Sequence, residues 1–217
     1  MEGPLSGDGA QARAELAASD PVMAGLVERL GEMSIDERQR RRGIERPDAY
    51  GALLRTIVGQ QLSTKAARTI HGRVLALFDG RTPNPEELLA VSEEDLRAAG
   101  LSGRKVSYIR DLANHVLDGE LELDRLEQLS DEEAIEEIVA VRGLGRWSAE
   151  MFLMFHLGRP DVFSGGDLGL RKAIQVEYGL DEMPTPQEVV ERSEAWRPHR
   201  SLASLYLWES LAAVPGG

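Results

Sequence analysis

The sequence predicts an all-α fold, on three observations. Apolar residues recur every three or four positions along most of the chain, and residues that cap helices precede many of these segments. No stretch alternates polar and apolar side chains over the length of a strand. At 217 residues the chain has the size of one compact unit or two small lobes, and it is long enough to bury a core.

The N-terminal part begins with a segment of weak pattern. Because its start is rich in Gly, Ser and Pro, we expect residues 1–19 to form a flexible tail, with a short helix in its second half. Asp20 is an N-cap residue followed by the first-turn proline Pro21, so a helix starts there and carries apolar residues to Leu30. The segment from Ser34 to Arg46 is polar and irregular.

From residue 48 onward the helical pattern is nearly continuous. Ser63, Asn84, Ser92, Ser130 and Thr185 each precede an apolar-periodic run, as N-cap residues do. Helices are therefore predicted, in order, over 50–58, over 63–78, after 84, after 92, over 106–116, over 130–139, around 151–155, over 170–178, after 185 and over 201–213.

The chain is acidic, with 37 Asp and Glu residues against 25 Lys and Arg and a net charge of −12. A nucleic-acid partner normally meets a basic face, so the net charge by itself argues against one. The basic residues gather in short groups beside glycine turns, however, which permits a local basic cleft on an acidic body. The alternative is that both signs of charge lie on solvated faces. The basic groups lie at 38–42, 104–110, 142–146, 171–172 and 197–200.

Cysteine and hydropathy exclude several classes of protein. The chain contains no cysteine, which excludes disulfides, zinc–thiolate sites and cysteine-held iron–sulfur clusters. It contains no run of about 18 apolar residues and no signal-peptide pattern. We therefore expect a cytoplasmic protein that does not enter a membrane.

The stretch over residues 130–172 is the one that indicates chemistry. Gly143 and Gly145 lie between two helical patterns, where the lack of a Cβ permits a sharp turn and brings backbone N–H groups close to a partner. These amides open the second helix, whose dipole favours an anion, and Arg142 and Arg146 flank the turn. A phosphate is the expected ligand. The alternative is a glycine helix stop in an ordinary αα-turn.

A second glycine segment, Ser164-Gly165-Gly166, ends at a single carboxylate, Asp167. The position of Asp167 at the start of a predicted helix favours its ionised form. Two interpretations stay open: a chemical role for the carboxylate, or service as the N-cap of that helix. One residue can do both.

Four separated motifs carry a family resemblance, which runs from about Asp20 to the end of the chain. In chain order they are Ile57-Val58-Gly59-Gln60-Gln61-Leu62-Ser63, Gly143-Leu144-Gly145-Arg146-Trp147-Ser148-Ala149, Val162-Phe163 with Asp167, and Trp196-Arg197-Pro198-His199-Arg200-Ser201. They resemble the helix-hairpin-helix DNA glycosylase superfamily, and within it the 3-methyladenine DNA glycosylase II group. The resemblance implies two helical lobes with a DNA-binding cleft between them. One is residues 48–160, with the helix-hairpin-helix motif; the other is residues 20–47 plus 161–217, built from both ends of the chain.

The resemblance implies that Asp167 is catalytic. Cleaving an N-glycosidic bond builds positive charge on the sugar, and a fixed carboxylate near C1′ stabilises that charge and orients or deprotonates the attacking water. Bifunctional relatives carry, at the position of Trp147, a lysine that attacks C1′. A tryptophan there implies a monofunctional enzyme that leaves an abasic site.

The family's pocket for the flipped base corresponds to aromatic positions of this chain. Trp147 and Trp208 match those positions, with Met151 and Tyr206 as neighbours, and electron-rich ring faces suit a cationic alkylated purine. The alternative for both tryptophans is burial in the core, which is the role we assign to Trp196.

The resemblance also implies residues that contact DNA. One loop matches the segment that fills the gap left by the flipped base, with either Gln61 or Leu62 as the plug. The backbone carbonyls of Val139, Val141 and Leu144 match a site for a monovalent cation that bridges to phosphate. The implied DNA-binding set is Gln60, Gln61, Leu62, Ser63, Gly143, Gly145, Arg146, Ser148 and Lys172.

These residues predict a monofunctional DNA glycosylase that excises alkylated bases, of the 3-methyladenine type, by hydrolysis in base-excision repair. Its expected partner is double-stranded DNA with a damaged base; it acts as a monomer and requires no cofactor. Four alternatives remain: a noncatalytic helix-hairpin-helix DNA-binding module, a glycosylase for other damaged bases, a lyase acting on oxidised bases, and a helical protein-interaction scaffold.

Overall fold

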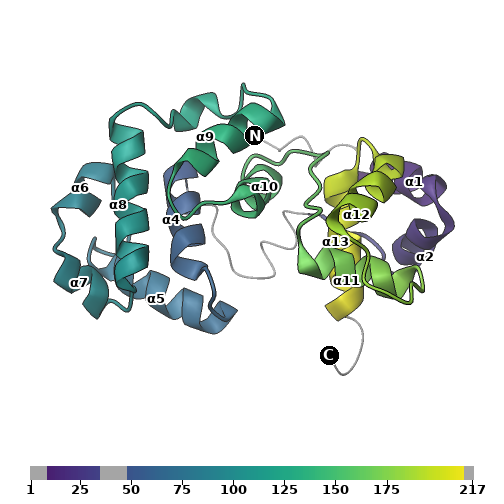
Figure 1. Cartoon of the computed structure of the whole chain (residues 1–217), viewed down its shortest axis with the longest axis horizontal. Coiled ribbons are helices and arrows are strands. Elements are labelled where there is room, and N and C mark those ends of the chain that lie inside the picture. The colour runs from purple at the N-terminus through teal and green to yellow at the C-terminus, as the bar shows by residue number, and fades with distance from the viewer. Residues whose placement is uncertain (1–8, 35–47, 213–217) are drawn as a thin grey trace. The chain divides into compact units, whose positions relative to one another are not determined.

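The computed structural model describes residues 9–34 and 48–212, and every regular element in these two ranges is helical (Figure 1). The all-α prediction is therefore confirmed. The chain divides into two compact units: a central unit, residues 46–152, and a terminal unit, residues 1–45 together with 153–217. Each unit has its own core.

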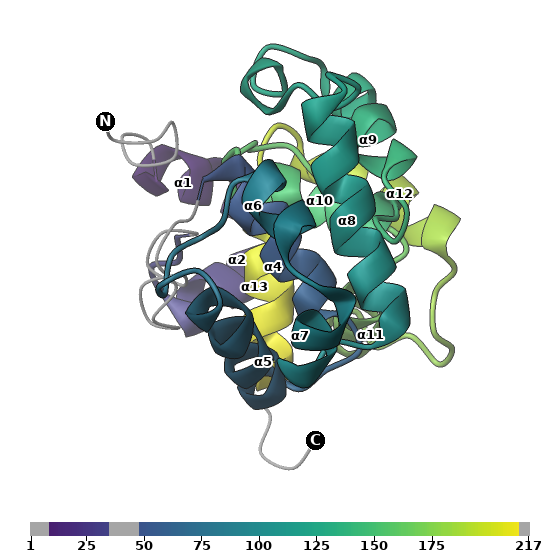
Figure 2. The ribbon, with the colours of Figure 1, turned by 90° about the vertical axis from the view of Figure 1, so that its left-hand side faces the viewer.

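The central unit is organised around its longest helix, α8 (Gly103–Leu117). Helices α4, α6 and α7 pack against α8 (Figure 2), and apolar residues such as Leu54, Ile57, Leu96, Ile109 and Leu112 have no exposed surface. Each such buried side chain contributes ~1.5–3 kcal/mol relative to exposure. The other helices of this unit are α4 (Ala49–Gly59), α5 (Thr64–Ala76), α6 (Pro85–Ala90), α7 (Glu93–Ala98), the 3-10 turn η1 (Leu123–Arg125), α9 (Asp131–Ala140) and the first part of α10 (Arg146–Phe155).

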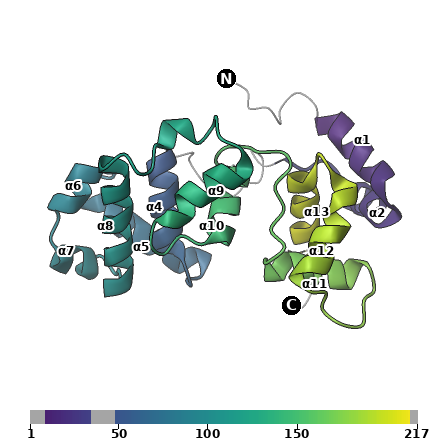
Figure 3. The ribbon, with the colours of Figure 1, turned by 45° about the horizontal axis from the view of Figure 1, so that its top comes forward.

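The terminal unit brings both ends of the described chain together around α13 (Arg200–Ala212). Helices α1, α2 and α11 pack against α13 (Figure 3). Its other elements are α1 (Gly9–Ser19), α2 (Pro21–Leu30), α11 (Leu168–Glu177), α12 (Pro186–Ser193) and the 3-10 turn η2 (Glu194–Trp196). Trp196 is buried in this core, as predicted, and its Nε1 donates to Asp20 Oδ2 at 2.9 Å.

The helix starts follow the predicted caps. The side chains of Ser63, Asn84, Ser92, Ser130 and Thr185 each accept a hydrogen bond from a backbone N–H in the first turn of the helix that follows. Asp20 likewise caps α2, accepting from the amides of Val22 and Met23. These bonds satisfy N–H groups that have no partner inside the helix.

The second half of the N-terminal segment contains the short helix that was expected there, α1, so residues 9–19 are helical and do not form a flexible tail. Leu16 of α1 is buried in the core of the terminal unit, and this tertiary burial stabilises a helix whose own sequence pattern is weak. The expectations for residues 1–8, for most of the 34–46 segment and for residue 213 lie outside the described residues. Within the described ranges, none of the helices combines the length and apolar character that crossing a bilayer requires.

Candidate functional site

Asp167 lies at the end of the glycine loop and is the N-cap of α11. Its Oδ1 accepts a hydrogen bond from the Leu170 amide at 2.8 Å and another from Trp208 Nε1 at 3.0 Å. The residue is half-buried, so its carboxyl group is neither packed in the core nor freely solvated. Two donors on one oxygen orient the carboxylate.

The indole of Trp208 reaches this carboxylate because the first turn of α11 carries a glycine. A Cβ on Gly169 would lie 3.0 Å from Asp167 Oδ1 and 3.2 Å from Trp208 Nε1, tighter than ordinary van der Waals contact. The ring of Trp208 also stacks on Phe155, with centroids 5.9 Å apart and planes 28° apart. Trp208 is half-buried, so it serves both as a hydrogen-bond donor to Asp167 and as an aromatic wall beside it.

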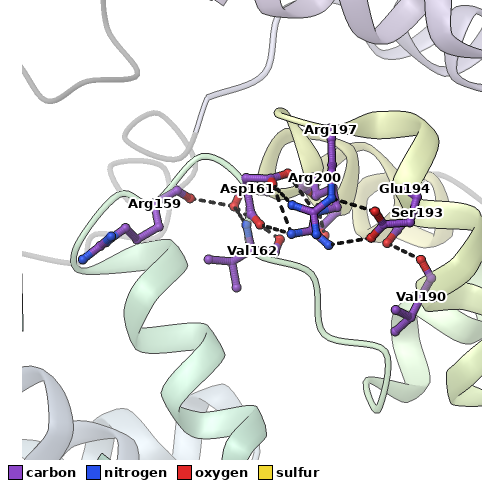
Figure 4. Close-up of polar contacts among 10 residues, drawn as sticks. Arg159, Asp161, Val162, Val190, Ser193, Glu194, Arg197 and Arg200 are labelled. Atoms are coloured by element: carbon purple, nitrogen blue, oxygen red, sulfur yellow. Dashed lines mark hydrogen bonds and ion pairs between the residues drawn. The ribbon is translucent and has the colours of Figure 1, made fainter. Parts of the chain in front are cut away.

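Two sets of contacts fix the loop that carries Asp167. At Gly165, a Cβ would lie 2.9 Å from the Pro186 carbonyl oxygen, so only glycine allows the loop to approach the start of α12 this closely. At the loop's beginning, the Asp161 carboxylate accepts from Arg197 Nη1 and from Arg200 Nε (Figure 4). Arg200 also donates to the Asp161 carbonyl oxygen at 2.7 Å. The Asp161 side chain is 22% exposed, and a network of charge-assisted bonds with this little exposure holds geometry better than a solvated pair.

In the central unit, α9 and α10 form the predicted hairpin. A capping box between Ser130 and Glu133 starts α9, and Val141 is its C-cap. Gly143 takes a φ of +88°, a conformation that L side chains rarely adopt, and the ring of Tyr108 packs where its Cβ would be. The amides that open α10 then follow the turn, the arrangement that favours an anion at a helix N-terminus.

Ion pairs engage both arginines of the hairpin. Arg146 donates to both oxygens of Glu132, at 2.9 and 2.5 Å, and to Glu150 at 3.0 Å. The bonds to Glu132 hold the pKa of Arg146 above its ordinary value. Arg142 donates through its backbone amide and its Nε to Asp111, at 2.8 and 2.7 Å. Burial alone would raise the pKa of Asp111, but these bonds from Arg142 lower it, so Asp111 stays ionised.

The segment between α4 and α5 holds the predicted gap-filling residues. Gln61 has a φ of +58°, unusual for a residue other than glycine, and Leu62 is 36% exposed. The Gln60 side chain is half-buried and donates from Nε2 to the Gly143 carbonyl oxygen at 2.7 Å. Ser63 is the N-cap of α5. Gln61 and Leu62 thus present their side chains outward, while Gln60 ties the loop to the hairpin.

The remaining predicted residues divide between the units. Trp147 is 48% exposed and Met151 is half-buried, both on α10 in the central unit, while Trp208 belongs to the terminal unit. Tyr206 has no exposed surface, and its OH donates to the Gly31 carbonyl oxygen at 2.8 Å. This position corrects the expectation for Tyr206, because a residue fully packed in the core with its hydroxyl satisfied has no face to offer a base.

Ser148, Lys172 and the residues of the predicted cation site differ in their exposure and in their hydrogen bonds. The Ser148 side chain is buried in the first turn of α10. Lys172 is exposed on α11 and donates to Gln175 Oε1 at 3.1 Å. Val139 is 40% exposed, and the Val141 carbonyl accepts from the Leu144 amide at 3.1 Å. Among the described residues, His, Asp and Glu side chains form no cluster that could hold a metal ion.

Sequence reasoning missed the residues of α8 that support these segments. Lys105 Nζ donates to the carbonyl oxygens of Val58 and Gln60, at 2.7 Å each, Tyr108 covers Gly143, and Asp111 binds Arg142. One signal was available: Asp111 is an acidic residue among the apolar positions of its helix, and a buried carboxylate needs a partner. The chain offers no such signal for Lys105.

The sequence and the fold were compared with known proteins. Residues 54–198 match the family model described as HhH-GPD superfamily base excision DNA repair protein. The chain is 36% identical over 171 residues to DNA-3-methyladenine glycosylase 1 of Schizosaccharomyces pombe, covering 78% of this chain and 75% of that protein. It is 34% identical over 168 residues to a putative DNA-3-methyladenine glycosylase of Bacillus subtilis, covering 75% of this chain and 58% of that protein.

Solved structures of similar proteins have the same fold. A DNA-3-methyladenine glycosidase from Bacillus halodurans aligns with a TM-score of 0.81 and 38% identity, covering 93% of this chain and 89% of that one. The S. pombe 3-methyladenine DNA glycosylase, solved in complex with abasic DNA, aligns with a TM-score of 0.82 and 32% identity, covering 95% and 99%. Because the family model matches well over half of its residues, the chain belongs to the HhH-GPD superfamily of base excision DNA repair proteins.

Proposed function

We propose that this protein is a monofunctional DNA glycosylase that removes alkylated bases, of the 3-methyladenine type, from double-stranded DNA. The family and the names of its relatives support the class of reaction. The observation that carries the assignment to a residue is the geometry of Asp167. Its carboxylate is half-buried, oriented by a backbone amide and an indole, and set on a loop fixed by the Gly165 and Asp161 contacts.

The proposed reaction follows from that geometry. The bond between C1′ and the base nitrogen breaks, its electron pair leaves with the base, and positive charge develops on the sugar. The Asp167 carboxylate stabilises this charge, and a water adds to C1′ and gives its proton to the carboxylate or to solvent. A cationic alkylated purine leaves as a neutral base, so no strong general acid is needed. The product DNA carries an abasic site.

The absence of lyase chemistry is part of the proposal. A lyase forms a Schiff base between C1′ and an amine, and no lysine stands between Val141 and Ala149. Trp147 occupies that segment with 48% of its surface exposed, which suits contact with a flipped base. Borohydride trapping should therefore yield no covalent protein–DNA adduct.

In this proposal, DNA binds to the hairpin and to the segment between α4 and α5, which we call the gap-filling loop. Backbone amides at the start of α10 bind phosphate, and Gln61 or Leu62 fills the gap left by the base. A monovalent cation held by the carbonyls of Val139, Val141 and Leu144 would add a positive charge beside that phosphate. The proposed acting form is a monomer.

The test is release of bases from methylated duplex DNA by the wild-type protein and by Asp167→Asn. Asparagine also caps helices, so the variant should keep its fold and its binding to abasic-site DNA. We expect base release to fall at least ~100-fold, the scale of losing one group that stabilises transition-state charge. The control is Asp48→Asn, the same change at the N-cap of α4, where the carboxylate accepts from the Gly51 amide at 2.7 Å.

Two results would contradict the proposal. A wild-type protein that binds abasic-site DNA but frees no base would indicate a noncatalytic DNA-binding module. An Asp167→Asn variant that frees bases at the wild-type rate would reduce Asp167 to a helix cap. Identification of the freed bases by chromatography defines the range of lesions in the same experiment.

A further inference from the structure

We propose that Lys105, Tyr108 and Asp111 of α8 form a platform that holds the gap-filling loop and the phosphate-binding hairpin in one fixed geometry. Lys105 is the positioning residue on which entry of the loop into DNA depends. This inference rests on the proposed function, since it gives these segments their roles. All of the contacts lie within the central unit.

The ammonium group of Lys105 binds the end of α4. Its Nζ lies 2.7 Å from the carbonyl oxygens of both Val58 and Gln60, at the C-terminal end of α4. A cation there binds carbonyls that no longer have a partner inside the helix and complements the negative end of the helix dipole. Lys105 is half-buried, and this burial lowers the pKa of its ammonium group.

These bonds hold the loop between α4 and α5. The chain leaves α4 at Gln60 and enters the left-handed region at Gln61, with a φ of +58°. A residue other than glycine persists in that conformation only when its surroundings impose it. The bond from Lys105 to the Gln60 carbonyl fixes the peptide group directly before Gln61, so it supplies that constraint.

The same loop is linked to the hairpin. Gln60 donates from Nε2 to the Gly143 carbonyl at 2.7 Å, so the loop and the hairpin share a direct bond. Tyr108 packs against Gly143, and Asp111 binds the amide and the Nε of Arg142. The spacing of Lys105, Tyr108 and Asp111, three residues apart, places them along one side of α8. One helix thus supports both segments that the proposed function assigns to DNA.

This geometry has a consequence for binding. A loop already held in its inserted shape loses little conformational entropy when it enters DNA, so it adds affinity where a gap is available. It adds nothing on intact duplex, where the stacked bases leave no gap. Lys105 should therefore control the preference for abasic-site DNA over intact DNA, and not binding in general.

The test measures the affinity for two synthetic duplexes, one intact and one with a tetrahydrofuran abasic-site analogue. For Lys105→Met we expect the preference for the analogue to fall ~10-fold, the scale of a lost charge-assisted bond, with affinity for intact DNA unchanged. Lys105→Arg, which keeps a cation and its donors, should retain most of the preference. Arg97→Met, which removes an exposed charge on α7 whose only close partner among the described residues is Glu93, at 3.9 Å, should behave as wild type.

A purely structural role for Lys105 would lower the melting temperature and leave the ratio of the two affinities unchanged, and that result would overturn the inference. A wild-type protein without any preference for the analogue would overturn it as well. If Lys105→Met melts below the assay temperature, the same two affinities are measured for Gln60→Leu, which removes the bond to the hairpin. Loss of the preference for the abasic-site analogue in this variant supports the platform, and an unchanged preference refutes it. The readout is binding alone, so failure to release bases in the methylated-DNA assay counts against the proposed function separately.

Discussion

Replacing Gly143 by alanine tests whether the hairpin is built as described. The backbone at Gly143 has a φ of +88°, and an L residue in that region costs about 1–2 kcal/mol. The new Cβ would also fall on the ring of Tyr108, within 2.5 Å of its Cγ, and must displace that ring. Overpacking of this kind costs about 1–3 kcal/mol. The free energy of unfolding should therefore fall by about 2–5 kcal/mol, the sum of the two effects.

A double-mutant cycle separates the two contributions. In a Tyr108→Ala background the ring is gone, so Gly143→Ala should cost only the backbone contribution of about 1–2 kcal/mol. Urea denaturation followed by circular dichroism gives the free energies, with the slope against urea checked for constancy. The same cost in both backgrounds would show that Tyr108 does not pack on Gly143. No cost in either would show that the positive φ is not required.

Two further predictions concern the terminal unit. Trp208→Phe keeps a ring to stack on Phe155 but removes the donor to Asp167, so single-turnover base release should fall ~10-fold or more, the worth of a hydrogen bond to a charged group. In an Asp167→Asn background the same change should cost nothing more, and additive losses would contradict an effect through the carboxylate. Asp20→Asn should lower the free energy of unfolding by about 1–3 kcal/mol at neutral pH, because an amide cannot accept from both the backbone amides and the Tyr178 and Trp196 donors. Burial alone would raise the pKa of Asp20, but these hydrogen bonds lower it. The wild-type protein should therefore lose its extra free energy of unfolding over Asp20→Asn as the pH falls below about 4, where the carboxylate becomes protonated. A difference in unfolding free energy that does not change with pH would refute this prediction.

The sequence was informative where the interaction is local. A cap such as Ser63 bonds an amide three residues away, and the apolar spacing of each helix shows its buried side within two turns. The hairpin is local as well, since its glycines lie between two helices adjacent in the chain. These features could therefore be predicted from the order of residues alone, together with the position of Asp167 at a helix start.

The sequence was uninformative where partners are distant in the chain. Gln60 bonds a carbonyl 83 residues away, and Trp196 bonds a carboxylate 176 residues away. Helical spacing places Tyr206 and Trp208 on the same helix, but it does not say that one is sealed in the core and the other bonds to Asp167. The packing of helix α1 against α2 and α13 could not be predicted for the same reason, because α13 lies far along the chain.

The charges of the described residues bear on how an acidic protein would hold DNA. Glu132 and Glu150 engage Arg146, and Asp111 engages Arg142, so a phosphate at the hairpin competes with carboxylates for both guanidinium groups. The backbone amides at the start of α10 and the dipole of that helix are a further source of attraction for a phosphate. Helix α5, which directly follows the gap-filling loop, adds positive charge near that loop, because it carries three Lys and Arg residues and no acidic residue. Affinity built in this way depends on a few close contacts and little on the net charge of the protein.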